Sequence, residues 1–155
     1  MARRTPTPSP KDGRAAATPD VTHPGPGPGP GLGPATGRPD VYVDFTLEHG
    51  LLFIVLRNIG SASAYDVVTR FDQPFRGLGG RKDISCIALF RSLQFIPPGK
   101  QFTQLVDHID AYFRREEPTR ITASITYADR DGRRYTEAVP HDLEIYRDLD
   151  ETLPR

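Results

Sequence analysis

The stretch RITASITYADRDGRRYTEAV, residues 120–139, decides the fold class. Its first half carries an apolar side chain at every second position, the pattern of a half-buried β-strand. Asp131-Gly132 follows, and Asp-Gly between alternating runs is a strong signal for a tight hairpin turn. A second run returns to Val139, where Pro140 is expected to end the strand because proline cannot donate to a ladder. The apolar face of the first strand consists of Ile121, Ala123, Ile125 and Tyr127.

The same signals recur upstream. Residues 41–48 alternate, His49-Gly50 makes a two-residue break, and residues 51–56 are apolar throughout. This pattern predicts a hairpin whose second strand is central and covered on both faces. Further strands are expected at residues 64–71 and 101–109. In the first of these, one face should carry Tyr65, Val67, Thr69 and Phe71.

Turn-forming residues predict the connections between the strands. Asn58 precedes Gly60, and an asparagine side chain can bond its own downstream backbone, so a turn is expected there. Residues 84–90 fit either one helical turn or a short strand, and residues 111–115 fit a brief helical turn. Tyr146 is expected to clamp the end of the domain.

About seven short strands, frequent turn signals and no long helix predict an all-β, antiparallel, immunoglobulin-like sandwich. The chain has 155 residues, which is enough for one domain. Residues 1–39 are rich in proline and glycine and are expected to be a disordered N-terminal tail. The sandwich is expected at 40–146 and a flexible charged tail at 147–155.

Three stretches resemble immunoglobulin-like β-sandwich domains of bacterial proteins, similar in style to the CARDB group. They are LRNIG at 56–60 with AYDV at 64–67, IPPG at 96–99, and the final hairpin at 127–135. The resemblance covers residues 40–146 and implies a turn between central strands, a sheet-crossing strand and a last hairpin. It implies no catalytic residue, and the chain lacks the Cys…Trp…Cys core of antibody domains.

Composition excludes several classes of protein. Twenty basic and twenty acidic residues give zero net charge, which argues against nucleic acid or a membrane as partner. No apolar run is long enough to span a bilayer. Cys86 is the only cysteine, so no disulfide or cysteine-based zinc site is expected, and its apolar neighbours predict a buried thiol. A free cysteine without a secretory signal favours the cytoplasm.

No catalytic, cofactor or metal site is predicted. No histidine pair has the short spacing typical of metal ligands. Asp129 and Asp131 are read as turn residues, and the glycine-rich segment 77–82 lacks the spacing of a phosphate-binding loop. The histidines are His23, His49, His108 and His141; the carboxylates expected on a solvated edge are Asp107, Asp110, Glu116 and Glu117.

The absence of a reactive cluster favours a non-catalytic protein-interaction module, with the partner and oligomeric state left open. Its candidate surface is a mobile basic loop with two exposed apolar anchors, Phe75 and Leu78. The loop's charged residues are Arg76, Arg81 and Lys82. One alternative is an accessory subunit that assembles through a sheet edge near Thr136. The other is an enzyme using His108 or Asp107.

Overall fold

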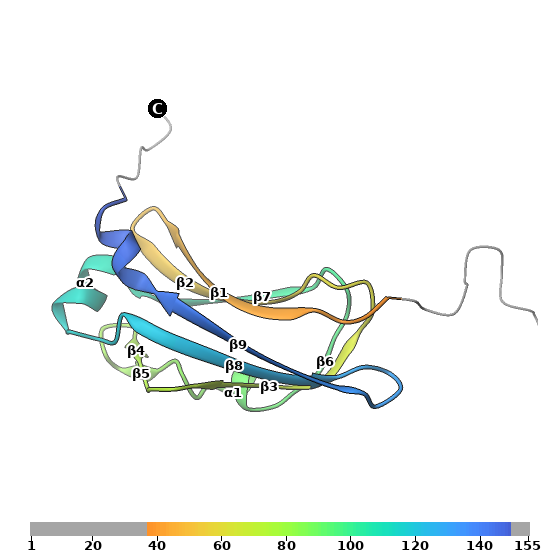
Figure 1. The fold of residues 1–155 in the computed structure, drawn as a ribbon. Coiled ribbons are helices and arrows are strands. Elements are labelled where there is room, and N and C mark those ends of the chain that lie inside the picture. Colours follow the sequence, from red (N-terminus) through yellow and green to blue (C-terminus); the bar gives the residue numbers. More distant parts are fainter. Residues whose placement is uncertain (1–36, 150–155) are drawn as a thin grey trace, which may run out of the picture. The chain divides into compact units, whose positions relative to one another are not determined.

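The computed structural model describes residues 37–149, in which two antiparallel sheets lie in two layers (Figure 1). Most of the predicted N-terminal tail, and residues 150–155 of the C-terminal tail, fall outside the described residues. In chain order the elements are β1 (Val41–Glu48), β2 (Leu51–Asn58), β3 (Ala64–Phe71), β4 (Arg76–Gly77), β5 (Lys82–Asp83), α1 (Ala88–Arg91), β6 (Leu93–Ile96), β7 (Gln101–His108), α2 (Ile109–Arg114), β8 (Arg120–Ala128), β9 (Arg134–Asp142) and the 3-10 helix η1 (Leu143–Arg147).

One sheet has the strand order β1-β2-β7 and the other has the order β6-β3-β8-β9, while β4 and β5 form a separate two-stranded ladder. The predicted all-β, antiparallel class is therefore confirmed. Buried side chains from both large sheets belong to one hydrophobic cluster, which includes Val43 and Leu52 from the first sheet and Ile121 and Ile125 from the second. Period-two alternation thus produces two apolar faces that pack on each other.

Both predicted hairpins are present. His49 and Gly50 have φ angles of 51° and 76°, and two successive positive values are typical of a type I′ turn. In the β8–β9 hairpin, the Asp129 carboxylate accepts hydrogen bonds from the N–H groups of Asp131 and Arg133, each at 2.9 Å. The expected end of β9 at Pro140 is wrong, because the strand continues to Asp142. Since β9 is an edge strand, the missing donor of a proline costs no ladder hydrogen bond there.

Two faces differ from simple alternation because of β-bulges. In β3 the register shifts after Tyr65, where Asp66 has a φ angle of 51°. Because of this shift, Tyr65 does not share the buried face of Val67. It pairs instead with Phe95 of β6 on the exposed face of the sheet, where the two rings are in contact. In β7 a shift opposite Leu52 and Phe53 brings Asp107 into a buried position, so its expected place on a solvated edge is wrong.

The segment between β3 and β6 has the least regular sequence pattern of the domain. Ile84 is buried. Of the helical turn and the short strand expected within residues 84–90, the helical turn forms, as α1. The expected burial of Cys86 is wrong, because its thiol is exposed. Its apolar neighbours Ile84 and Phe90 enter the core, while the turn between them leaves Cys86 on the surface.

Candidate interaction surface

The predicted binding loop lacks its main anchor. Phe75 is 0% exposed, and its ring lies edge-on to Phe45 and Phe71 at centroid distances of 5.8 and 5.1 Å. The expectation that Phe75 is exposed is therefore wrong, because its apolar ring fills the core. Leu78 is only half-buried. Three charged side chains of the loop do lie at the surface, those of Arg76, Arg81 and Lys82.

This loop is also tied to the rest of the domain, contrary to the expected mobile loop. The N–H of Leu78 donates to the Val106 carbonyl at 2.8 Å, and the N–H of Gly79 donates to the Asp107 carboxylate at 3.0 Å. Arg115 lies 2.6 Å from the same carboxylate. Burial alone would raise the pKa of Asp107, but the Gly79 N–H and the Arg115 guanidinium outweigh it and lower that pKa.

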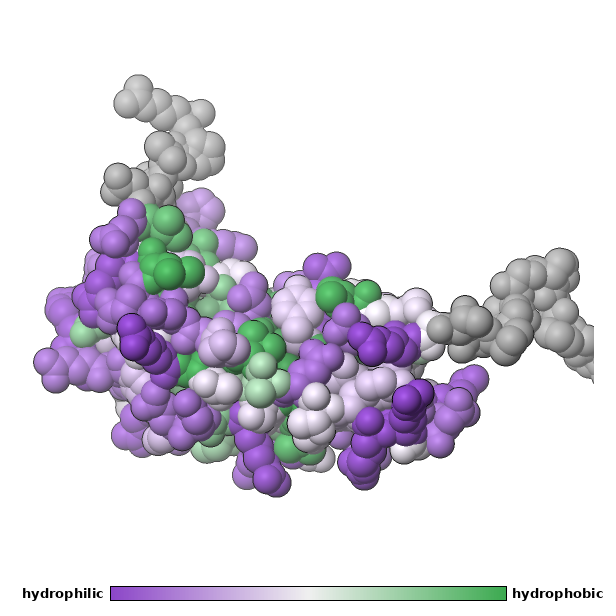
Figure 2. Space-filling view, in the orientation of Figure 1, coloured by the Kyte–Doolittle hydropathy of each residue, from purple (hydrophilic) through white to green (hydrophobic). Residues whose placement is uncertain are grey.

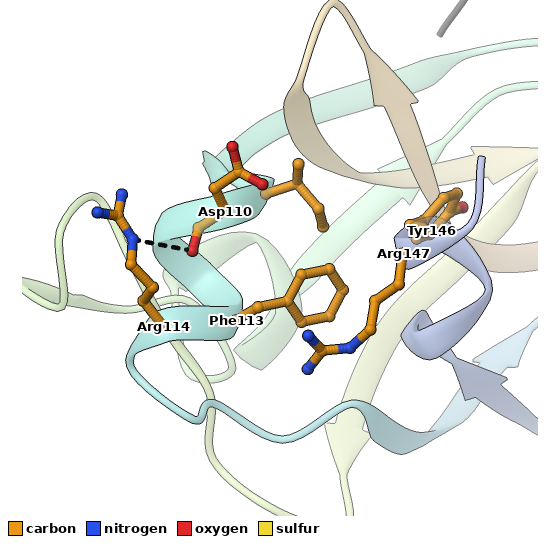
Figure 3. A pocket seen from close by; sticks show the side chains of 6 residues that line it. Asp110, Phe113, Arg114, Tyr146 and Arg147 are labelled. Atoms are coloured by element: carbon orange, nitrogen blue, oxygen red, sulfur yellow. Dashed lines mark hydrogen bonds between the residues drawn. The ribbon is translucent and has the colours of Figure 1, made fainter. Parts of the chain in front are cut away.

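A more promising surface lies between α2 and η1. The groove has a volume of about 640 Å³, which is within the range of ligand-binding clefts. Figure 3 shows the Phe113 ring and the Arg147 side chain facing each other, with Arg114 farther from η1. The lining residues are Ile109, Asp110, Phe113, Arg114, Tyr146 and Arg147.

Two arginines of this α2–η1 groove differ in how they are held. The Arg147 guanidinium lies 3.9 Å from the centroid of the Phe113 ring and also pairs with Glu144. Arg114 donates only a long hydrogen bond of 3.4 Å to the Asp110 carbonyl, and across residues 37–149 it forms no ion pair. Arg147 is therefore oriented by the protein, whereas the charge of Arg114 is available to a partner.

Tyr146 fixes the base of the groove. Its hydroxyl donates a hydrogen bond to the Phe45 carbonyl on β1, which ties η1 to the sheet as the sequence predicts for a clamp. Burial, and then the negative charge of Asp44, raise the pKa of Tyr146. Beside it, Ile145 and Leu149 are 59% and 56% exposed. Figure 2 shows hydrophobic side chains gathered over this end of the domain.

The groove contains no assembled catalytic group. His108 lies 3.9 Å from the exposed Asp110 carboxylate, and the residues that line the groove include no serine, threonine, cysteine or lysine. In the part of the chain that the structure describes, no three His, Cys, Asp or Glu side chains meet as metal ligands would. His49, His108 and His141 therefore do not converge on a metal, and His23 lies outside the described residues.

No sequence pattern identifies Phe113, Arg114 or Arg147 as residues of a binding surface. The only signals near them are the helical turn expected at residues 111–115 and the clamp expected at Tyr146. These two segments lie side by side because β9 continues past Pro140, so that η1, which follows it, is placed beside α2. That continuation depends on β9 lying at a sheet edge, which local patterning does not reveal.

Fold and surface define an antiparallel β domain with an open, aromatic and arginine-lined groove. No helix among residues 37–149 has the length and apolar character needed to cross a membrane. The chain belongs to the family described as Domain of unknown function (DUF8453), whose profile matches residues 35–147. A search of the curated proteins finds no match.

Proposed function

We propose that this protein is a non-catalytic interaction module that docks a partner protein in the α2–η1 groove. The observation that carries the proposal is the Arg147 guanidinium held over Phe113, with the uncommitted Arg114 nearby. Aromatic and arginine side chains dominate the binding energy of protein interfaces. A partner segment that combines an apolar side chain with a carboxylate matches this lining.

The proposed setting is the cytoplasm, where an exposed free thiol such as that of Cys86 stays reduced.

The proposal includes an immunoglobulin-like scaffold, and strand order supports it. In the constant-type fold the first, second, fourth and fifth strands form one sheet, and the third, sixth and seventh form the other; this chain differs in that its fourth long strand, β6, pairs with the third. Here β1, β2 and β7 lie together, and β3, β8 and β9 lie together with β6 added at the edge. Loops at the ends of such sandwiches commonly carry binding residues. α2 lies in the connection between β7 and β8, and η1 follows the last strand and lines the same groove.

The test is a comparison of captured partners between groove and loop variants. A Phe113→Ala, Arg114→Glu double variant should lose a partner that the unchanged protein captures in a stoichiometric complex. The matched control, Arg76→Glu with Arg81→Glu, reverses two exposed charges in the loop that the sequence favours as the binding surface. Circular dichroism must show that both variants fold. Loss in the loop variant with retention in the groove variant would move the docking surface to residues 76–82.

Assembly through a sheet edge is the second candidate, because Thr136 lies on the exposed edge strand β9. Such an edge can pair with a strand of another chain. If the chain assembles through this edge, the mass measured by light scattering should rise with protein concentration. The Thr136→Pro variant should keep the mass of the monomer. A constant monomer mass for the unchanged protein would remove it.

A further inference from the structure

The end of the domain opposite α2 carries a second surface, where three connections between strands meet (Figure 1). One hollow there has a volume of about 230 Å³ and draws lining residues from all three connections. They are Ser61, Ala62 and Ser63 between β2 and β3, Pro98 between β6 and β7, and Arg130 between β8 and β9. Tyr65, at the start of β3, completes the lining. Segments far apart in the sequence therefore form one site.

A second hollow, of about 410 Å³, adjoins the first, because Tyr65 and Arg130 line both. Its lining also includes Asp66 of β3 and Asp129 and Gly132 of the β8–β9 hairpin. The two hollows together are called the hairpin-end surface below. Because they are adjacent, one extended segment of chain can occupy both.

Tyr65 reaches this surface because of the bulge in β3. Strict alternation would place its ring on the core side with Val67. The register shift, with Asp66 at a φ angle of 51°, turns the ring outward instead. There it lies 5.4 Å from the ring of Phe95 on β6, which is 46% exposed. The hairpin-end surface thus continues into an exposed aromatic pair.

Several polar groups of the hairpin-end surface are uncommitted. Across residues 37–149 the Tyr65 hydroxyl forms no hydrogen bond. In the same residues the side chains of Arg130 and Asp66 form neither a hydrogen bond nor an ion pair. Asp129 differs, because its carboxylate accepts from two backbone N–H groups and, at 3.0 Å, from the Tyr135 hydroxyl. The surface therefore offers two free donor side chains and one free carboxylate.

This chemistry fits a proline-rich segment. Such a segment adopts the polyproline II conformation, in which the backbone carbonyls have no internal hydrogen-bond partner. The Tyr65 hydroxyl and the Arg130 guanidinium can donate to such carbonyls, whereas the carbonyls of a helix are already bonded. Proline-rich segments also dock in grooves lined by aromatic rings. In the larger hollow the carboxylates of Asp66 and Asp129 outnumber Arg130, so its charge favours a basic side chain.

We propose that the hairpin-end surface binds a proline-rich segment of a partner protein in the polyproline II conformation. The prolines pack against Tyr65, and a basic side chain of the segment pairs with Asp66. This site is separate from the α2–η1 groove and takes an occupant of different chemistry.

The probe is a fluorescent nonapeptide of proline and alanine with one terminal arginine, and the protein is the full chain. Fluorescence polarisation gives the Kd. In amide NMR spectra the peptide should shift the signals of residues 61–66 and 128–132 and leave those of α2 in place. A version with glycine in place of each proline should bind at least about tenfold more weakly, because the flexible chain must first be ordered.

Variants of the two shared side chains test the lining. Tyr65→Ala should weaken binding of the proline peptide at least about tenfold, a change of about 1.4 kcal/mol. Tyr42→Ala, which removes a half-buried tyrosine from β1, is the matched control and should bind normally. Circular dichroism must show that both variants fold. If Tyr65→Ala does not, Arg130→Ala replaces an exposed side chain and should weaken binding several-fold.

The role of Asp66 has its own test. Asp66→Asn removes the charge and keeps a residue type that tolerates a positive φ angle. It should abolish the preference for the arginine peptide over a version with alanine in place of the arginine. Asp131→Asn neutralises an exposed carboxylate of the neighbouring hairpin outside the lining, and it should keep that preference.

Equal binding of the proline and glycine peptides, or no binding at about 1 mM proline peptide, a Kd weaker than about −4.1 kcal/mol in free energy, would overturn the proposal. A tighter complex with a glutamate version than with the arginine version would also overturn it. The Phe113→Ala, Arg114→Glu variant should bind the proline peptide normally. Failure of the hairpin-end surface and failure of the α2–η1 groove are thus separate results.

Discussion

Asn58 joins three parts of the domain through one buried side chain. Its carbonyl oxygen accepts from the N–H groups of Asp40 at 3.2 Å and Gly60 at 3.0 Å. Its amide donates to the carbonyls of Ala62 at 2.8 Å and Ile96 at 3.0 Å. Ile96 ends β6, so this residue of the first sheet also bonds to the second. The turn role predicted from the sequence is confirmed, and the link between sheets adds to it.

Replacing this side chain should be costly. Asn58→Ala leaves several buried polar groups without partners, so we expect a loss of roughly 2–4 kcal/mol in the free energy of unfolding. Gln94→Ala is the matched control, because it removes an exposed amide from β6 and should change stability by less than about 0.5 kcal/mol. Urea denaturation measures both. Similar midpoints for the two variants would contradict the role assigned to Asn58.

His141 makes stability depend on pH. Burial lowers the pKa of His141 below its usual 6.5, and this outweighs the Asp44 charge and a hydrogen bond with the Val43 backbone, both of which raise it. The unfolded chain therefore takes up the proton first as pH falls. Stability should be full above about pH 6.5 and decline as pH drops through 6.5 toward the folded-state pKa. His141→Gln should flatten this decline in urea denaturation between pH 7 and 5, and an unchanged slope would contradict the prediction.

At the scale of elements, the outer edge of β1 is covered by side chains. The N–H of Ile59 donates to the Asp40 carbonyl, so alternation turns the backbone of Val41, Val43 and Phe45 away from β2. The Tyr146 hydroxyl donates a hydrogen bond to the Phe45 carbonyl among these groups. Tyr127 and His141 lie beside the backbone of Val41 and Val43. An edge covered in this way resists pairing with other chains.

The β4–β5 ladder depends on a glycine. A Cβ atom added at Gly77 would lie 2.0 Å from the Val106 carbonyl oxygen, so an alanine there must push the ladder away from β7. We expect Gly77→Ala to cost about 1–3 kcal/mol of unfolding free energy. Lys82→Ala, an exposed change on the neighbouring strand, should cost less than about 0.5 kcal/mol. Equal stability of the two variants in urea would contradict the close approach.

Local patterning predicts an element well where the element's own residues determine its burial. The alternation in β1 and β8 is of this kind, and both strands bury the predicted faces. Phe75 and Asp107 are different, because their burial depends on the β4–β5 ladder and on a bulge opposite β2. The α2–η1 groove is harder still. Phe113 and Arg147 are far apart in sequence, and only the path of β9 brings them together.

At the scale of the described domain, aromatic rings join the two sheets and the segment between them. Phe45 of β1 contacts Phe75, Phe75 contacts Phe71 of β3, and Phe71 contacts Phe90 of α1, with centroid distances of 5.8, 5.1 and 5.1 Å. Each such pair adds about 0.5–1.5 kcal/mol beyond the area it buries. Since neither sheet covers its own apolar face, separating the layers exposes both faces at once.

Residues 37–149 should therefore unfold in a single cooperative transition. Tyr112 and Tyr127 are buried in the shared core, and the chain has no tryptophan, so tyrosine fluorescence reports on packing between the sheets. Far-ultraviolet circular dichroism reports on the strands. The two urea curves should coincide, because strands that lose the opposite layer also lose the burial that stabilises them. A fluorescence change that precedes the loss of strand signal would mean that one sheet persists alone, which a core shared between both sheets does not allow.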